Sequence, residues 1–227
     1  AAQLAVYAAQ AGKGGAVFSF EMSSGEIWRR MIAHCGGLSL GRLNHGSLAG
    51  QDRRDAHSAL SQLDAMPLWI DDSTGCTVQA MTAALRKHRN AGKPLDLIVV
   101  DYLQLMQAPR RREKRVEEIT EISRKLKLAA RDLAVPVVVL SQLNRESERE
   151  GGRPELHQLR ESGAIEQDAD IVIFLWQDKK ERQSAIAARR PGEMELIIAK
   201  QRNGSVGRAM VQFDPRIMTL SDSTARP

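Results

Sequence analysis

The chain has 227 residues, of which 42% are hydrophobic, 27% charged and only 4% aromatic. This composition is typical of one soluble globular domain with an aliphatic core. The formal net charge of +5 favours a polyanionic partner, although many cytosolic enzymes are equally basic.

Cys35 and Cys76 have neither the spacing of metal ligands nor the number that a disulfide framework needs. We therefore expect reduced thiols in a cytoplasmic protein. The opening AAQLAVYAAQA is too short to span a membrane and lacks the basic flank of a signal peptide, so no membrane association is expected. Because the chain begins without Met, we also expect further residues upstream.

Helix-period and strand-period patterns alternate from the start of the chain. The Ala-rich residues 1–11 predict a helix, and the apolar run GAVFSF at 15–20 predicts a strand buried in a parallel sheet. Residues 23–35, SSGEIWRRMIAHC, predict an amphipathic helix that a serine can cap. The next predicted elements are a polar helix over roughly 51–65, a strand at 67–72 and a helix over about 77–91.

The alternation continues through the second half and ends in consecutive strands. LDLIVVDY at 95–102 predicts a strand, and residues 116–133 predict a long amphipathic helix. Further strands are predicted at 135–141, at 169–176, and at 193–200 and 208–214, with no helix between the last two. The predicted fold class is α/β, with a mostly parallel central sheet and antiparallel C-terminal strands.

The cluster AGKGG at residues 11–15 invites comparison with a P-loop. A Walker A loop reads G-x-x-x-x-G-K-[ST] and joins a strand to a helix, so that helix N–H groups and the lysine meet phosphates. Here a predicted helix precedes the cluster and a strand follows it, and Gly14 stands where Ser or Thr would hold magnesium. We therefore interpret Gly12 as a left-handed helix end that leads into a tight turn.

Polar residues follow three of the predicted strands. Asp101 ends LIVVD in the form of a Walker B strand, Glu21 follows FSF, and Ser141 and Gln142 follow VVVL. In α/β sheets ligands bind beyond the carboxyl ends of the strands, where carboxylates can meet a nucleotide's magnesium and polarise an attacking water. Each ending alone is an ordinary turn residue, but the three together predict an active site.

Six segments in order resemble motifs of the DnaB-type replicative helicases. They are FSFEMS, WIDDSTG, LIVVDYLQLM, EISRKLKLAARDLAVPVVVLSQLNR, LRESGAIEQDADIVIFLW and IIAKQRNGSVG. The resemblance covers nearly the whole chain and implies that residues 1–227 are a single RecA-like ATPase domain with three layers. Two family parts are absent, namely the helical N-terminal domain and the upstream Walker A segment. Without the Walker A Lys and Thr, we expect the chain alone to bind ATP poorly and hydrolyse essentially none.

The resemblance also implies roles at the nucleotide. Glu21 would be the general base for water, and Asp101 the carboxylate on the Mg2+ side. Gln142 would couple the γ-phosphate to the DNA loop that follows it. Arg30 matches a position whose side chain can stack on adenine, and a solvated helix arginine is the alternative interpretation.

Further implied roles concern the neighbouring subunit and DNA. Lys200 and Arg202 match trans-acting fingers that offset charge at a neighbour's γ-phosphate. Arg160, Glu161 and Gly163 match the loop that holds the backbone of single-stranded DNA, with a capped helix start as the alternative. The charged run PRRREKR is a second candidate for DNA contact, or simply a solvated loop.

Taken together, the resemblance implies an ATP-driven, Mg2+-dependent helicase motor. It would form a homo-hexamer around single-stranded DNA, unwind duplex DNA, and work with a helicase loader and a primase. Two alternatives stay open. One is a recombinase or circadian-clock-type relative of RecA, and the other is an ATPase-dead protein that docks a loader or assists assembly.

Overall fold

The computed structural model describes residues 1–108, 115–143 and 152–223, without the side chains of 160–162. The helices are α1 (Ala2–Gln10), α2 (Ser24–Gly36), α3 (Leu40–Asn44), α4 (Gln51–Asp64), α5 (Val78–Asn90), α6 (Arg115–Leu133), α8 (Gly163–Asp168) and α9 (Lys179–Ala187), with short 3₁₀ helices η1 (Leu103–Leu105) and η2 (Leu156–Ser162). The strands are β1 (Gly15–Ser19), β2 (Leu68–Asp71), β3 (Leu97–Asp101), β4 (Val137–Val139), β5 (Ile171–Trp176), β6 (Gly192–Gln201), β7 (Gly207–Asp214) and β8 (Thr219–Asp222).

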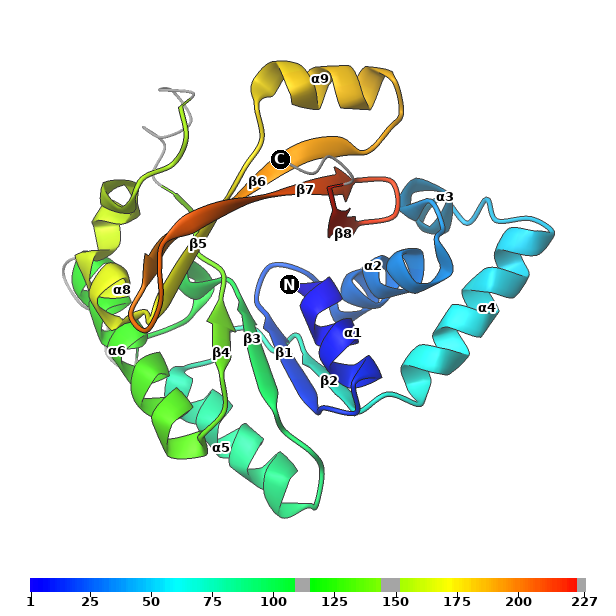
Figure 1. The fold of residues 1–227 in the computed structure, drawn as a ribbon. Helices are drawn as coiled ribbons and strands as arrows, with labels where there is room; N and C mark the ends of the chain where they lie inside the picture. Colours follow the sequence, from blue (N-terminus) through cyan, green and yellow to red (C-terminus); the bar gives the residue numbers. More distant parts are fainter. Residues whose placement is uncertain (109–114, 144–151, 224–227) are drawn as a thin grey trace.

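The strands form a parallel and an antiparallel group, which confirms the predicted fold class. The order β2-β1-β3-β4 is parallel, and the order β5-β6-β7-β8 is antiparallel. In the described part of the chain the two groups are separate four-stranded sheets, where the sequence predicted one sheet. Figure 1 shows α5 and α6 on one face of the parallel sheet and α1, α2 and α4 on the other, so this half of the molecule has three layers.

The parallel sheet is buried on both faces, as its apolar strands predict. β1 is buried along its whole length, and β3 is buried at its three central residues. Alternate side chains enter opposite clusters: Phe18 and Ile98 pack with α5 and α6, whereas Val17 and Val99 pack with α1 and α2. These two aliphatic clusters hold the strands rigidly in register.

The AGKGG cluster is a helix end, as the sequence indicated. Gly12 has φ +74°, and the N–H groups of Gly12 and Lys13 donate to carbonyls in the last turn of α1. A Cβ on Gly14 would overlap the carbonyl group of Pro94, so only glycine fits there. The cluster therefore turns the chain from α1 into β1, and it is not a phosphate-binding loop.

The antiparallel sheet lies across the carboxyl ends of the parallel strands (Figure 1). Its β8 end is tied to the first helices: the Gln3 carboxamide donates to the Leu220 carbonyl at 2.6 Å and accepts from the Leu220 N–H at 2.8 Å. His34 Nδ1 on α2 lies 2.7 Å from Thr219 Oγ1. At its other end, β5 follows directly on α8, which packs on α6.

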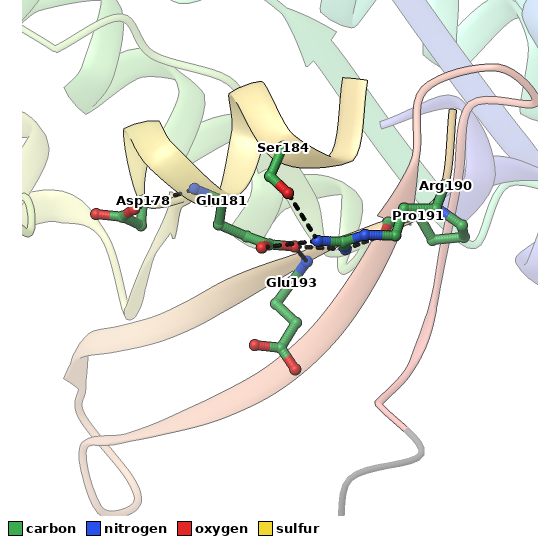
Figure 2. Close-up of polar contacts among 6 residues, drawn as sticks. All are labelled: Asp178, Glu181, Ser184, Arg190, Pro191 and Glu193. Carbon is green, nitrogen blue, oxygen red and sulfur yellow. Dashed lines mark hydrogen bonds and ion pairs between the residues drawn. The ribbon is translucent and has the colours of Figure 1, made fainter. Parts of the chain in front are cut away.

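Helix α9, between β5 and β6, is an element that the sequence patterns do not predict. Figure 2 shows how it is held: the Asp178 carboxylate accepts from the Glu181 N–H at 3.1 Å. It also accepts from the Lys180 N–H at 2.9 Å, and these bonds cap the helix. The Glu181 carboxylate then accepts from Arg190 at 2.7 and 3.0 Å and from the Glu193 N–H at 3.2 Å. Because Arg190 and Glu193 flank the start of β6, these contacts fix α9 to that strand.

We predict that Glu181→Ala loosens α9 without unfolding the domain. The variant removes the only carboxylate drawn in Figure 2 that joins the helix to the start of β6. Hydrogen exchange of the α9 amides is expected to accelerate by roughly two- to fivefold, the range of an exposed ion pair. Gln183→Ala, at an exposed position of the same helix, is the matched control and should leave exchange unchanged. Equal exchange in both variants would contradict the prediction.

Candidate functional site

The carboxyl ends of the parallel strands bring Glu21 and Asp101 together. β1 and β3 pair in parallel with Ser19 opposite Asp101, and the Phe20 N–H donates to the Asp101 carbonyl at 2.8 Å. Glu21 is therefore the second residue beyond a strand end whose partner is Asp101. The name carboxylate edge is used below for Glu21, Asp101 and the backbone around them.

Asp101 is half-buried at this edge. Burial raises the pKa of its carboxyl group, and the negative charge of Glu21 raises it further, while the positive charge of Arg30 opposes the rise. No hydrogen bond to the Asp101 carboxylate is found within the described residues. A partly desolvated carboxylate without a donor is an electrostatically strained group, and a bound cation would relieve that strain.

The carboxylate edge fits Mg2+ but not a metal held by protein alone. Across the described ranges, no group of three or more His, Cys, Asp or Glu side chains is arranged to hold a metal ion. Mg2+ does not need such a group, because it is usually bound by one or two carboxylates together with water and substrate phosphates. Asp101, with Glu21 beside it, supplies that donor set.

One positive side chain and the start of α1 lie beside the carboxylate edge. Arg30 on α2 acts through its charge to lower the pKa of Asp101. Ala1, at the start of α1, lies close enough to Asp101 for the two to interact electrostatically. The adenine-stacking role of Arg30 stays a prediction, and the structure adds that its charge acts on the Asp101 carboxyl group.

Gln142 lies just past β4 with its side chain exposed, and a residue that the sequence analysis missed holds its backbone. The Gln104 amide donates to Ser141 Oγ at 2.9 Å, and its oxygen accepts from the Gln142 N–H at 3.3 Å. The Arg115 guanidinium donates to the Gln104 carbonyl. Gln104 thus ties the end of β4 to the turn after Asp101, and the only sequence signal is an amide three residues beyond a strand-ending aspartate.

Asp72 is a second residue that the sequence analysis did not single out. Its carboxylate accepts from the Ser24 N–H at 2.7 Å and joins the end of β2 to the start of α2. Ser23 and Glu26 form a capping box at the same helix start. The segment that carries Glu21 is therefore fixed immediately behind the carboxylate edge.

Lys200 and Arg202 lie apart from the carboxylate edge. Both donate to main-chain carbonyls near the end of α8, and Arg202 also lies 3.6 Å from the Asp170 carboxylate. Neither residue is among the charges that act on the pKa of Asp101. Within one chain, these two candidate fingers and the candidate magnesium ligand occupy different places.

The candidate DNA loop is described only in its backbone. Arg160 and Glu161 belong to η2, and α8 begins at the exposed Gly163, so the chain does start a helix at this motif. The side chains of Arg160 and Glu161 lie outside the described residues. So does the basic run at 109–114, of which only the adjoining Arg115 is described.

Comparison with known proteins gives a consistent result. The model of the DnaB-like helicase C-terminal domain matches residues 1–222. Replicative DNA helicase DnaB of Geobacillus stearothermophilus is 41% identical over 200 residues, which cover 87% of this chain and 43% of the relative. The corresponding helicase of Mycobacterium leprae is 43% identical over 190 residues, covering 83% of this chain and 31% of the relative. The chain thus spans less than half the length of these relatives.

Solved structures agree with the sequence comparison. One solved ATPase domain superposes with a TM-score of 0.89 at 29% identity, covering 98% of this chain and 78% of that one. A DnaB-like replicative helicase, described with its interactions with primase, gives a TM-score of 0.86 at 30% identity and covers 95% of this chain and 53% of that one. Cys35 and Cys76 are free thiols. Among the described helices, none combines the length and apolar character needed to cross a membrane.

The two aspartates at the strand ends should affect stability with opposite signs. Because the pKa of Asp101 is raised, ionisation of its carboxyl group lowers the free energy of unfolding. This loss of stability begins above the ordinary pKa of about 3.9 and is complete once the pH exceeds the folded pKa. Hydrogen bonds from Ser24 lower the pKa of Asp72, so its ionised form stabilises the fold at neutral pH and this contribution is lost as the pH falls through its folded pKa.

We therefore predict that, without Mg2+, Asp101→Asn raises the melting temperature at pH 7 and that Asp72→Asn lowers it. The Asp101→Asn difference should shrink as the pH is lowered towards 4, whereas the Asp72→Asn difference should largely persist there. Thermal unfolding followed by circular dichroism at the two pH values measures them. A lower melting temperature for Asp101→Asn at pH 7 would show that its carboxylate has a stabilising partner.

Proposed function

The chain belongs to the DnaB-like helicase C-terminal domain family, and from this membership we propose that it is the ATP-driven motor of a replicative DNA helicase. The observation that carries the proposal is the pairing of Glu21 and Asp101 at the carboxyl ends of two parallel strands in a chain that matches the family over residues 1–222. Membership also favours a helicase over the recombinase alternative.

We propose that residues 1–227 form a single RecA-like ATPase domain that an upstream Walker A segment completes. Among the described strands, β4 pairs only with β3 and β5 pairs only with β6, so β4 and β5 each leave one edge of their sheet free. A Walker A loop connects a strand to a helix, and α1 starts beside Asp101. One additional strand between the free edges would join the sheets and bring its loop to the start of α1.

The residues at the carboxylate edge then take distinct parts in hydrolysis. Asp101 holds Mg2+, which when bound neutralises charge on the phosphate oxygens. Glu21 orients the attacking water and accepts its proton. Gln142 contacts the γ-phosphate, and Gln104 fixes the backbone from which it extends. Arg30 stacks on the adenine or balances the charge of the carboxylates.

Lys200 and Arg202 act on the nucleotide of a neighbouring subunit in this proposal. Their separation from Asp101 within one chain supports a site that two subunits complete. Head-to-tail contacts of this type close into a ring when the rotation permits, and we propose a homo-hexamer around single-stranded DNA. Arg160, Glu161 and Gly163 hold the DNA backbone.

The remaining partners are proposed from the relatives. A similar solved helicase is described with its interactions with primase, and we extend a primase partner to this protein. A helicase loader and a cytoplasmic location belong to the same proposal.

Mixing two inactive variants of the full-length protein tests the shared site. Glu21→Gln keeps the fingers but lacks the base, and Arg202→Ala keeps the base but lacks a finger. Each variant alone should lose about 10²–10⁵-fold in ATP turnover while still binding nucleotide. In mixed rings, Glu21→Gln subunits lend Arg202 to intact neighbouring pockets, so part of the turnover should return.

Co-assembly must be shown first, for example by pull-down of differently tagged subunits. Co-assembled rings without recovered turnover would mean that Arg202 acts within its own subunit, and the two-subunit site would be wrong. Loss of nucleotide binding in Glu21→Gln would make Glu21 a structural residue. Nucleotide binding without turnover by the unmodified full-length protein would favour the ATPase-dead alternative.

Arg160→Ala tests the DNA loop. If Arg160 contacts phosphate, the variant should bind every single-stranded sequence more weakly and to a similar degree. The slope of log affinity against log salt should fall by roughly one phosphate contact per subunit. Fluorescence anisotropy at several salt concentrations with two unrelated oligonucleotides measures both. An unchanged slope would leave only the helix-start interpretation.

A further inference from the structure

The two candidate fingers, Lys200 and Arg202, make contacts within their own subunit, in a cluster of residues around Asp170. Asp170 lies between α8 and β5, and its carboxylate pairs with Lys127 on α6 and lies 3.6 Å from the Arg202 guanidinium. The backbone N–H of Arg202 donates to the backbone carbonyl of Asp170 at 2.9 Å. The proximity of Lys127, Arg202 and Lys200 lowers the pKa of Asp170, with the Lys127 hydrogen bond as the largest cause.

We propose that Asp170 is a positioning residue that keeps Arg202 and Lys200 retracted on α8, and that single-stranded DNA at the start of α8 releases them. This inference rests on the proposed function, since it concerns how the fingers reach a neighbour's nucleotide. Asp170 itself is not a catalytic residue in this scheme.

The end of α8 explains why the fingers are held there. The last carbonyls of a helix have no partner within the helix, and cations are favoured beside them. Lys200 donates to the Glu166 carbonyl and Arg202 to the Gln167 carbonyl. Both fingers thus cap α8, and in this position their side chains are held against their own subunit instead of extending towards another subunit's phosphates.

The length of α8 links this cap to the DNA loop. The helix has six residues, from Gly163 to Asp168, which is about 9 Å of rise. Its first residue belongs to the candidate DNA loop, and its last turn carries the carbonyls that the fingers cap. The Asp168 carboxylate accepts from Ser123 Oγ at 2.8 Å, so the helix is also anchored to α6. A shift at one end of so short a helix must change the contacts at the other.

The ion pair between Asp170 and Arg202 is weak enough to open and close reversibly. Their side chains are 54% and 47% exposed, and exposed ion pairs contribute little to stability. The pair formed by Arg153 and Glu195 differs, because Arg153 donates to both carboxylate oxygens at 2.8 and 2.6 Å and Glu195 is only 11% exposed. The first pair can open during a catalytic cycle, whereas the second is a fixed part of the sheet.

Asp170→Asn in the full-length protein is the central test. Removing the retaining charge should raise DNA-free ATP turnover by roughly two- to fivefold, the range of an exposed ion pair, and lower the stimulation by single-stranded DNA to the same extent. Lys127→Met should shift DNA-free turnover in the opposite direction, because Asp170 then pairs with Arg202 alone. Asp170→Glu keeps the charge and should restore much of the stimulation. Asp132→Asn, which breaks an exposed ion pair with Arg86 between α6 and α5, is the matched control with unchanged stimulation.

The outcomes separate this inference from the proposed function. If Arg202→Ala turns over ATP like the unmodified protein, the finger assignment fails whatever Asp170 does. If Arg202→Ala is inactive while Asp170→Asn leaves the stimulation unchanged, or lowers both rates, the retracted position is wrong and the proposed function stands. Should Asp170→Asn not fold by circular dichroism, Lys127→Met decides, and equal or faster DNA-free turnover in that variant would overturn the inference.

Discussion

The parallel ladder between β1 and β3 is the constraint on which the candidate site depends. Both strands are buried between two aliphatic layers, so a shift of register would misplace every core side chain on them. The register sets Ser19 against Asp101, and it therefore also sets where Glu21 emerges. The energy that holds two carboxylates near each other comes from the hydrophobic core beneath them, which has no chemical part in the reaction.

Much of this edge could be predicted from the sequence because its signals are local. Apolar runs such as GAVFS and LIVVD identify buried parallel strands, and the polar residue that ends each run identifies the ligand side of the sheet. Gly12 likewise marks a helix end through its own backbone requirement. In each case the residue type and its immediate neighbours carry the information.

The parts that the sequence did not predict depend on contacts between distant segments. β8 is a short strand whose apolar content is low, and its anchors Gln3 and His34 lie in the first two helices. Helix α9 is polar except for its last three residues, and it rests on Glu181 and its partners. The hydrogen-bond partners of the Lys200 and Arg202 side chains at the end of α8 are main-chain carbonyls, which have no residue identity to detect. The division into two sheets is invisible for the same reason, since pairing of strand edges is a long-range property.

The bond between Gln3 and Leu220 has a consequence for how the chain is made. The two residues are 217 positions apart, so all the residues between them must leave the ribosome before their hydrogen bonds can form. The parallel core contains its own partners up to β4 and can assemble earlier during synthesis, because domains begin to fold from the N-terminal side. Closing a loop of this length adds a late and entropically costly step. Until that step, the face of α1 that later receives β8 stays exposed on the nascent chain.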